Sequence, residues 1–237
     1  AVYTTDPDIV KEASKLKTIS YEEMLELASL GAQVLHPRSV EIAKNYNMPM
    51  RVRSSFKPAD EGTLVQGVAK MELNKPVSGV ALDESQARVA ITGVPDKRGI
   101  AAKVFESLAK KNISVDMIVQ STSQDGINEI AFTVDKDTVG ETKKVTDEIA
   151  KDIGAKGVTT DTKIAKVSIV GAGMIGRPGI AAAMFKALAD SSINIQMIST
   201  SEIKVSCVID AKDADKAVKA IHKVFELDKV SKETQKV

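Results

Sequence analysis

The sequence has few of the residues on which disulfide, metal and aromatic-rich sites depend. Its 237 residues include one cysteine, two histidines and no tryptophan, and aromatic residues make up only 3%. A single cysteine excludes an internal disulfide and provides no cysteine cluster for a metal, so we expect no metal site. Cys207 lies in the apolar run IKVSCVID, which favours a small buried side chain over a nucleophile.

The sequence also lacks an excess of charge of one sign and long apolar runs. With 33 Lys and Arg against 32 Asp and Glu, the net charge is +1, so nucleic acid and charged membrane surfaces are not expected partners. No apolar run approaches the roughly 20 residues of a membrane span. The first residues, AVYTTDPDIV, do not resemble a signal peptide. We therefore expect a cytoplasmic protein with no membrane partner.

One segment of the sequence is repeated about 80 residues later. Gly99–Ser121 and Gly179–Ser201 share 11 identical residues over 23 positions, and the preceding Ala87–Gly93 matches Ala165–Gly171. Two copies of one module therefore follow each other along the chain.

Each copy has the order strand, helix, strand, strand, helix, and the first copy ends with a further strand, KGVTT. This βαββαβ order predicts a ferredoxin-like module with helices on one face of an antiparallel sheet. Apolar residues three and four apart predict the buried face of the first helix of each copy. They are Ala101, Val104, Phe105 and Leu108, and in the second copy Ala181, Met184, Phe185 and Leu188.

The second copy lacks its fourth strand, because a polar tail follows its second helix. A strand-like segment, Val77–Asp83, precedes the first copy instead. We predict that this segment completes the sheet of the second module and so interlocks the two. The fold class is α/β (α+β).

The stretch GAGMIG, Gly171–Gly176, matches the glycine pattern of a dinucleotide-binding turn. In such folds the helix opens inside the pattern, but here Arg177 and Pro178 come before the helix. The next strand ends without the acid that would bind the ribose, and the first copy lacks the glycines. We therefore expect neither NAD nor FAD.

The first 72 residues do not join the repeat. Ser20 and Glu23 form a capping box for a helix that ends at Gly31, and a second helix begins at Pro37. A strand, MRVRSSF, follows, then the turn-rich FKPADEGTLV and a linker, MELNKP. This block is typical of the end of a larger α/β domain.

Several long segments resemble the aspartate kinase family. VYTTDPDIV resembles its nucleotide-site segment, and SYEEMLELASLGAQVLHPRSVEIA and MPMRVRSSF resemble the end of its amino-acid-kinase domain. VGAGMIGRPGIAAAMF and NIQMISTSEIKVSCVID resemble its paired ACT regulatory domains. The resemblance divides the chain into a kinase-domain remnant (1–72), a first ACT domain (73–161, with 77–83 completing the second) and a second ACT domain (162–237).

The resemblance implies transfer of the γ-phosphoryl group of ATP, with Mg²⁺, to the side-chain carboxylate of aspartate. The family's lysine-containing glycine-rich segment and its aspartate-binding and catalytic residues have no counterpart in this sequence. Phosphoryl transfer needs positioned charges, so we assign no catalytic residue and expect the chain alone to be inactive. Since a separate regulatory subunit would not obviously include VYTTDPDIV, we favour a fragment of the full enzyme.

The resemblance also assigns a nucleotide site to Tyr3, Thr4, Asp6 and Pro7, although YTTDP taken by itself is typical of a surface turn. Gln33 stands where many family members have a lysine near the nucleotide. The absence of this lysine puts a role of Gln33 as a phosphate contact in doubt. His36, before a helix start and without a second ligand nearby, is interpreted as structural.

A regulatory site can be argued from the residues themselves. The turn into the helix at Gly99 leaves backbone N–H groups that suit a carboxylate, and Asp96 can pair with an ammonium group. The second copy offers a similar turn, but Arg177 makes an amino-acid ligand less expected there. The resemblance assigns effector binding to Asp96, Gly99, Ala101 and Gln120, with Asn194 and Ile195 completing the site across an ACT–ACT contact.

These observations favour feedback control by lysine and/or threonine, in a homodimer formed through ACT domains or in association with a catalytic aspartate kinase chain. One alternative is a stand-alone ACT amino-acid sensor without kinase activity. A second is the bifunctional aspartate kinase–homoserine dehydrogenase, whose dinucleotide domain would follow the ACT pair and finds no room in this chain.

Overall fold

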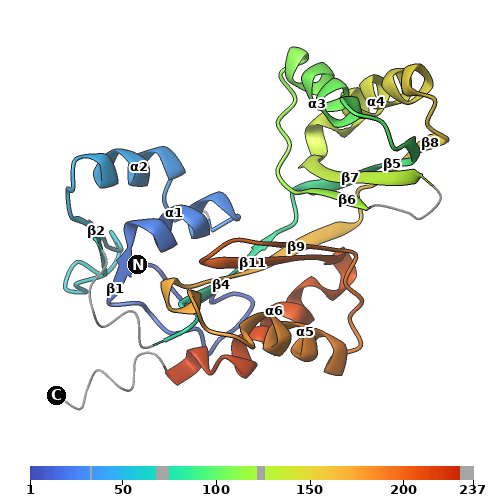
Figure 1. Cartoon of the computed structure of the whole chain (residues 1–237). Coiled ribbons are helices and arrows are strands. Elements are labelled where there is room, and N and C mark those ends of the chain that lie inside the picture. The colour runs from blue at the N-terminus through green and yellow to red at the C-terminus, as the bar shows by residue number, and fades with distance from the viewer. Residues whose placement is uncertain (33, 68–74, 122–125, 230–237) are drawn as a thin grey trace. The chain divides into compact units, whose positions relative to one another are not determined.

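The computed structural model describes residues 1–32, 34–67, 75–121 and 126–229 (Figure 1). The chain divides into two compact units. Unit one comprises residues 1–83 and 166–237, and unit two comprises residues 84–165.

Unit two is a ferredoxin-like module, as the repeat predicts. Its four strands form one antiparallel sheet in the order β6-β7-β5-β8. The second strand is shorter than expected, because residues 113–117 are irregular. The elements are β5 (Gln86–Pro95), α3 (Ile100–Lys110), β6 (Ile118–Ser121), β7 (Ile127–Asp135), α4 (Val139–Ile153) and β8 (Gly157–Asp161).

The core of unit two lies between this sheet and α3 and α4. Val104 and Leu108 of α3 are fully buried, as the helical periodicity predicts, and Phe105 meets the ring of Phe132 edge-on at 5.6 Å between centroids. Ala101 is exposed instead, so its assignment to the buried face is wrong. It lies in the first turn of α3.

The second module lies in unit one, and its fourth strand comes from before the first module. β4 pairs with β9 in an antiparallel register from Gly79 opposite Val170 to Asp83 opposite Lys166. The sheet order is β10-β11-β9-β4, which confirms the predicted role of Val77–Asp83. The elements are β4 (Gly79–Asp83), β9 (Ile164–Val170), α5 (Ile180–Asp190), β10 (Met197–Thr200), β11 (Lys204–Asp210) and α6 (Ala214–Val224).

The N-terminal block, residues 1–67, forms a small sheet with two helices. β1 (Thr18–Ser20) is parallel to β3 (Thr63–Gln66), and β2 (Met50–Val52) is antiparallel to β3. The helices are α1 (Tyr21–Ser29) and α2 (Pro37–Asn45). The sequence did not predict β1 or β3, and the predicted strand MRVRSSF ends at Val52. Residues 71–74 of the predicted linker lie outside the described residues.

Both ends of α1 form as the sequence predicts. Ser20 and Glu23 make the capping box. Gly31 has φ +104° just after the helix, and the Ala32 N–H donates to the Leu27 carbonyl at 3.0 Å. A Cβ at Gly31 would lie 2.5 Å from the Leu82 carbonyl oxygen, so glycine also lets this turn approach β4.

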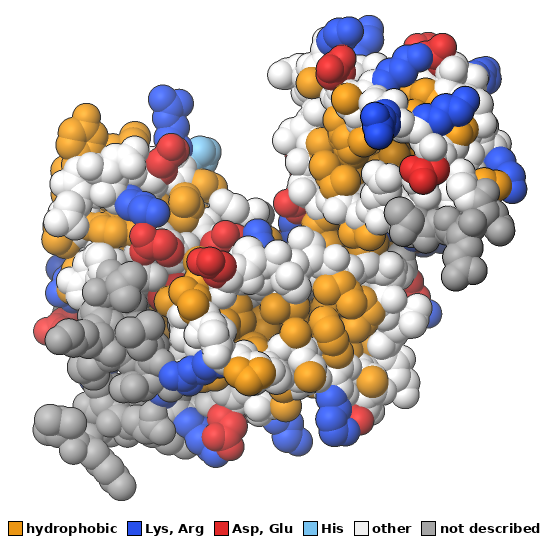
Figure 2. All heavy atoms as spheres, viewed as in Figure 1, with side chains coloured by type: hydrophobic (Ala, Val, Ile, Leu, Met, Phe, Trp, Pro, Cys, Tyr) orange, Lys and Arg blue, Asp and Glu red, His pale blue; other side chains and the backbone are white. Residues whose placement is uncertain are grey.

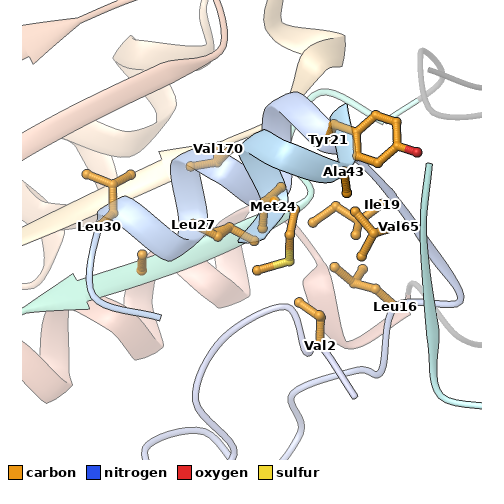
Figure 3. Close-up of a cluster of buried hydrophobic side chains, with 12 residues drawn as sticks. Val2, Leu16, Ile19, Tyr21, Met24, Leu27, Leu30, Ala43, Val65 and Val170 are labelled. Atoms are coloured by element: carbon orange, nitrogen blue, oxygen red, sulfur yellow. The ribbon is translucent and has the colours of Figure 1, made fainter. Parts of the chain in front are cut away.

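Helix α1 joins the N-terminal block to the second module through one hydrophobic cluster (Figure 3). Met24 and Leu27 of α1 lie in the same cluster as Ala81 of β4 and Val170 of β9. All seven residues of β9 are buried, which requires cover on both faces of the sheet. In Figure 1, α5 and α6 lie on one side of this sheet and α1 lies on the other.

Candidate effector-binding site

The entrance to α3 in unit two has the geometry of an anion site. Gly99, just before the helix, has φ +87°, and no described side chain caps the first turn. The first N–H groups of a helix have no partner within it, and together they attract negative charge. A Cβ at Gly99 would meet no heavy atom within 4 Å, so the space beside this turn is open.

Asp96 is held beside this entrance by neighbours on the sheet. Its N–H donates to the Gly126 carbonyl at 3.0 Å, and its Oδ1 accepts a hydrogen bond from Asn128 Nδ2 at 3.3 Å. Asn128 is buried and pairs with Val94 at the end of β5. Sequence reasoning missed Asn128, although a polar residue at the start of a strongly apolar strand was a usable signal.

Gln120 and Ala101 lie at the same end of the module. Gln120 is exposed on the edge strand β6 and lies opposite Ile130 of β7. Ile130 is two residues from Asn128, so the pleat places both side chains on one face of the strand. Asp96, Gly99, Ala101 and Gln120 are thus gathered where β5 and β6 end.

The two residues predicted to complete the site belong to the other unit. Asn194 is exposed and Ile195 is half-buried, in the loop between α5 and β10 of unit one. Their contact with Asp96 and Gly99 therefore stays a prediction.

The equivalent turn of the second module differs. Gly179 before α5 is also left-handed, with φ +94° and open space beside it. The preceding GAGMIG turn is filled, however: a Cβ at Gly173 would lie only 1.9 Å from the Lys75 carbonyl oxygen. At Gly171 the corresponding distance is 2.2 Å, to the Pro76 carbonyl oxygen. These two glycines make room for the protein's own backbone.

The predicted nucleotide segment is partly buried. Tyr3, Asp6 and Pro7 are exposed, and Asp6 Oδ1 accepts the Asp8 N–H at 2.8 Å to form a local turn. Thr4 is buried, and its hydroxyl accepts the Ser14 N–H at 3.0 Å. The Thr4 side chain therefore faces into unit one.

Thr4 also contacts the second module. Its hydroxyl oxygen lies 3.0 Å from Nε2 of His222 on α6, and its carbonyl accepts the Val80 N–H at 2.7 Å. Burial lowers the pKa of His222, against the opposing effect of the carboxylates of Asp228 and Glu12. His222 is thus favoured as a neutral hydrogen-bonding group.

Three further predictions concern single residues. His36 caps α2, because its Nδ1 accepts the Arg38 N–H at 3.2 Å, which agrees with a structural role. Cys207 is fully buried, and burial raises its pKa to about 12, so it does not form the thiolate of a nucleophile at neutral pH. Gln33 lies outside the described residues.

No described helix is long and apolar enough to cross a bilayer. No three His, Cys, Asp or Glu residues of the described ranges come together in an arrangement that could hold a metal ion.

Three parts of the sequence match known domain families. Residues 88–154 and 167–225 each match the ACT domain, and residues 1–54 match the amino acid kinase family. The chain is 49% identical over 228 residues to an aspartate kinase of Pseudomonas putida and 47% identical over 228 residues to aspartokinase 2 of Bacillus subtilis. Each match covers 96% of this chain and 55% of the relative, so the chain spans about half the length of these relatives.

Solved structures show the same likeness. The regulatory subunit of aspartate kinase from Thermus thermophilus is 43% identical with a TM-score of 0.61, over 64% of this chain and 99% of that subunit. An aspartate kinase of Clostridium acetobutylicum gives a TM-score of 0.84 at 29% identity, over 94% of this chain and 52% of that one. Escherichia coli aspartokinase III in complex with lysine and aspartate gives 0.72 at 30% identity, over 94% and 49%. The chain therefore belongs to the aspartate kinase family, as the end of an amino-acid-kinase domain followed by two ACT domains.

Proposed function

We propose that this chain is the amino-acid-sensing part of an aspartate kinase and binds lysine and/or threonine for feedback inhibition. The entrance to α3 carries the proposal, because it combines uncapped N–H groups, an open left-handed Gly99 and a fixed Asp96 carboxylate. The N–H groups suit the α-carboxylate of an amino acid, and Asp96 suits its ammonium group. The complex of the E. coli relative with lysine supports this choice of ligand class.

The remaining residues would recognise the rest of the ligand. Gln120 and Ala101 would border its side chain from β6 and from the first turn of α3. Asn194 and Ile195 of the second ACT domain would close the site across an ACT–ACT contact. Such a shared site would favour one arrangement of the two domains, by as much as the ligand's affinity differs between arrangements.

Calorimetry tests the effector site directly. Lysine, threonine and methionine would be titrated into the chain, and we expect heat with lysine or threonine. Asp96→Asn and Gln120→Ala should each weaken binding by about tenfold or more, since each removes a hydrogen bond to a charged or polar ligand group. Asp137→Asn, which changes an exposed carboxylate of the same unit, is the matched control. The absence of heat with all three amino acids would contradict the proposal.

In the assembled enzyme we propose that Tyr3, Thr4, Asp6 and Pro7 border the nucleotide, which is a substrate together with Mg²⁺. Tyr3, Asp6 and Pro7 offer exposed groups. Thr4 would hold this segment in place, since its hydroxyl already accepts a hydrogen bond inside unit one. The chain alone should give no aspartate-dependent ATP turnover, and adding the N-terminal half of the kinase domain should restore it. Failure to restore turnover would favour the alternative, a stand-alone ACT sensor without kinase activity.

The exposed edges of the two sheets support assembly. Ile118 on β6 and Ile198 on β10 occupy the same position of the repeat, and they are 50% and 43% exposed. Both lie on edge strands, which offer unpaired backbone groups and invite pairing. Figure 2 shows further hydrophobic side chains at the surface.

We propose a homodimer through the ACT domains, or an assembly with a catalytic aspartate kinase chain. A structure of aspartokinase alpha and beta subunits, of which this chain covers 99% of one chain at 44% identity, supports the second. Light scattering of the pure chain, with and without a catalytic chain, separates the two.

A further inference from the structure

Glu23 of α1 is a buried carboxylate with more partners than a helix cap requires. Its side chain is 1% exposed. Oε2 accepts hydrogen bonds from the Ser20 N–H at 3.2 Å and the Ser20 hydroxyl at 2.7 Å. Oε1 accepts from the Ser78 hydroxyl at 2.6 Å and from the Ala172 N–H at 2.9 Å. A buried carboxylate needs such donors, because its desolvation is otherwise very unfavourable.

The donors to Oε1 come from the second ACT domain, far from Glu23 in sequence. Ser78 lies just before β4, and Ala172 lies in the GAGMIG turn after β9. The backbone of residues 75–77 fills the space beside Gly171 and Gly173, where a Cβ would lie 2.2 and 1.9 Å from carbonyl oxygens. The turn is therefore occupied by the chain itself, with a carboxylate at one of its N–H groups.

We propose that the glycine-rich turn of the second ACT domain is a docking point for helix α1, with the Glu23 carboxylate as its ligand. This goes beyond the effector site proposed for the first ACT domain. This contact lies in the turn before Gly179, which is the repeat's counterpart of Gly99, so the two carboxylates would bind at different positions of the two domains.

The surroundings of Glu23 agree with a docking contact. On the same helix, Met24 and Leu27 lie in one cluster with Ala81 and Val170 of the second ACT domain, and this non-directional burial holds α1 against the sheet. The Glu23 carboxylate fixes the position of α1 along the sheet, because its two hydrogen bonds to Ser78 and Ala172 form only at one position. The N-terminal block thereby becomes sensitive to any change in the GAGMIG turn.

Hydrogen exchange on the full chain tests the proposal, read at the amide of Ala172 and at the amides of α1. In Glu23→Ala the Ala172 amide should exchange at least about tenfold faster, because it loses a buried charged acceptor. Acetate should slow this exchange again in the variant, more than chloride does at equal ionic strength. Glu22→Ala is the control, since Glu22 is on the same helix but pairs with Lys44 at 3.1 Å.

Two outcomes would overturn the assignment. One is an unchanged Ala172 exchange rate in Glu23→Ala, and the other is faster exchange that acetate slows no more than chloride. If Glu23→Ala does not fold, Glu23→Gln replaces it, because it keeps the side-chain volume. The wild-type protein offers a further test. Its Ala172 amide should exchange together with those of α1, and exchange at the rate of an open turn would contradict docking. Heat from lysine or threonine should remain in Glu23→Gln, so failure here is distinct from failure of the effector site.

Discussion

The two ACT domains begin from one repeated sequence and end with different outer surfaces. On the helix side of the sheet the repeat keeps its apolar residues, so Val89 and Val167 are both fully buried. On the other side, Arg88 of the first domain is half-buried, whereas its counterpart Lys166 is 2% exposed. The buried Lys166 then needs Asp83, 3.4 Å away on β4. A repeated fold therefore conserves the face that makes its core and adapts the other face to what covers it.

The largest expected effect tests this outer face. Lys166→Ala or Asp83→Ala should lower the free energy of unfolding by about 3–5 kcal/mol, because each removes the ion-pair contact of a buried charge. Arg88→Ala should cost about 1 kcal/mol or less, since Arg88 is partly solvated. Denaturant unfolding followed by circular dichroism measures both. The double variant Asp83→Leu/Lys166→Met should recover most of the loss, and a loss in the double as great as in either single variant would count against this explanation.

The helix-side cores offer the next comparison. Phe132 of β7 and Cys207 of β11 occupy the same position of the repeat, and both are fully buried. Phe132→Ala should cost about 3–5 kcal/mol, whereas Cys207→Ala should cost about 1 kcal/mol, because a much smaller cavity is left. Equal losses would show that the two cores are not equivalent. Thiol labelling gives an independent reading, since Cys207 should react only after unfolding.

The glycines separate close approach from backbone conformation. Gly173→Ala should destabilise unit one by about 3 kcal/mol or more, because its Cβ would overlap the Lys75 carbonyl oxygen at 1.9 Å. Gly99→Ala should cost only about 1–2 kcal/mol, because it has a left-handed φ of +87° but open space. Thermal unfolding of the two variants checks the order, and the reverse order would contradict the filled turn.

The smallest effect is a pH dependence confined to one domain. The unfolded chain binds a proton at His222 near the ordinary pKa of about 6.5, and burial lowers the pKa in the folded state. Its contribution to stability is thus complete above about pH 6.5 and is lost as the pH falls below it. Unit two has no histidine. Between pH 7 and pH 5.5, α6 should lose more protection from hydrogen exchange in the wild-type protein than in His222→Gln. Helix α3 should show no such difference between the two proteins.

Much of this fold was predictable because it follows from sequence patterns among residues that are close together in the chain. The repeat, the helical periodicity and the capping box of Ser20 and Glu23 depend on residues close in sequence. The role of Val77–Asp83 followed from a count of strands, since the second module had one too few. The turn at Gly99 was predictable for the same local reason, because glycine there precedes a periodic helix.

What escaped prediction depends on partners distant in sequence. β1 and β3 are three and four residues long and pair in parallel across about 45 residues, which leaves no periodic signal. Asn128 was missed because its partner, Asp96, lies 32 residues away. Glu23 was recognised only as a cap, since its bond to Ala172 spans 149 residues.

The position of β4 also sets an order of events during synthesis. Eighty residues separate the end of β4 from the start of β9, and the whole first ACT domain lies between them. At the usual 5–20 residues per second, β4 and the α1 surface leave the ribosome roughly 4–16 s before the strand that covers them. The first domain can close during that interval, while β4 waits as an unpaired edge. The sheet of unit one therefore stays incomplete until the whole of unit two has been synthesised.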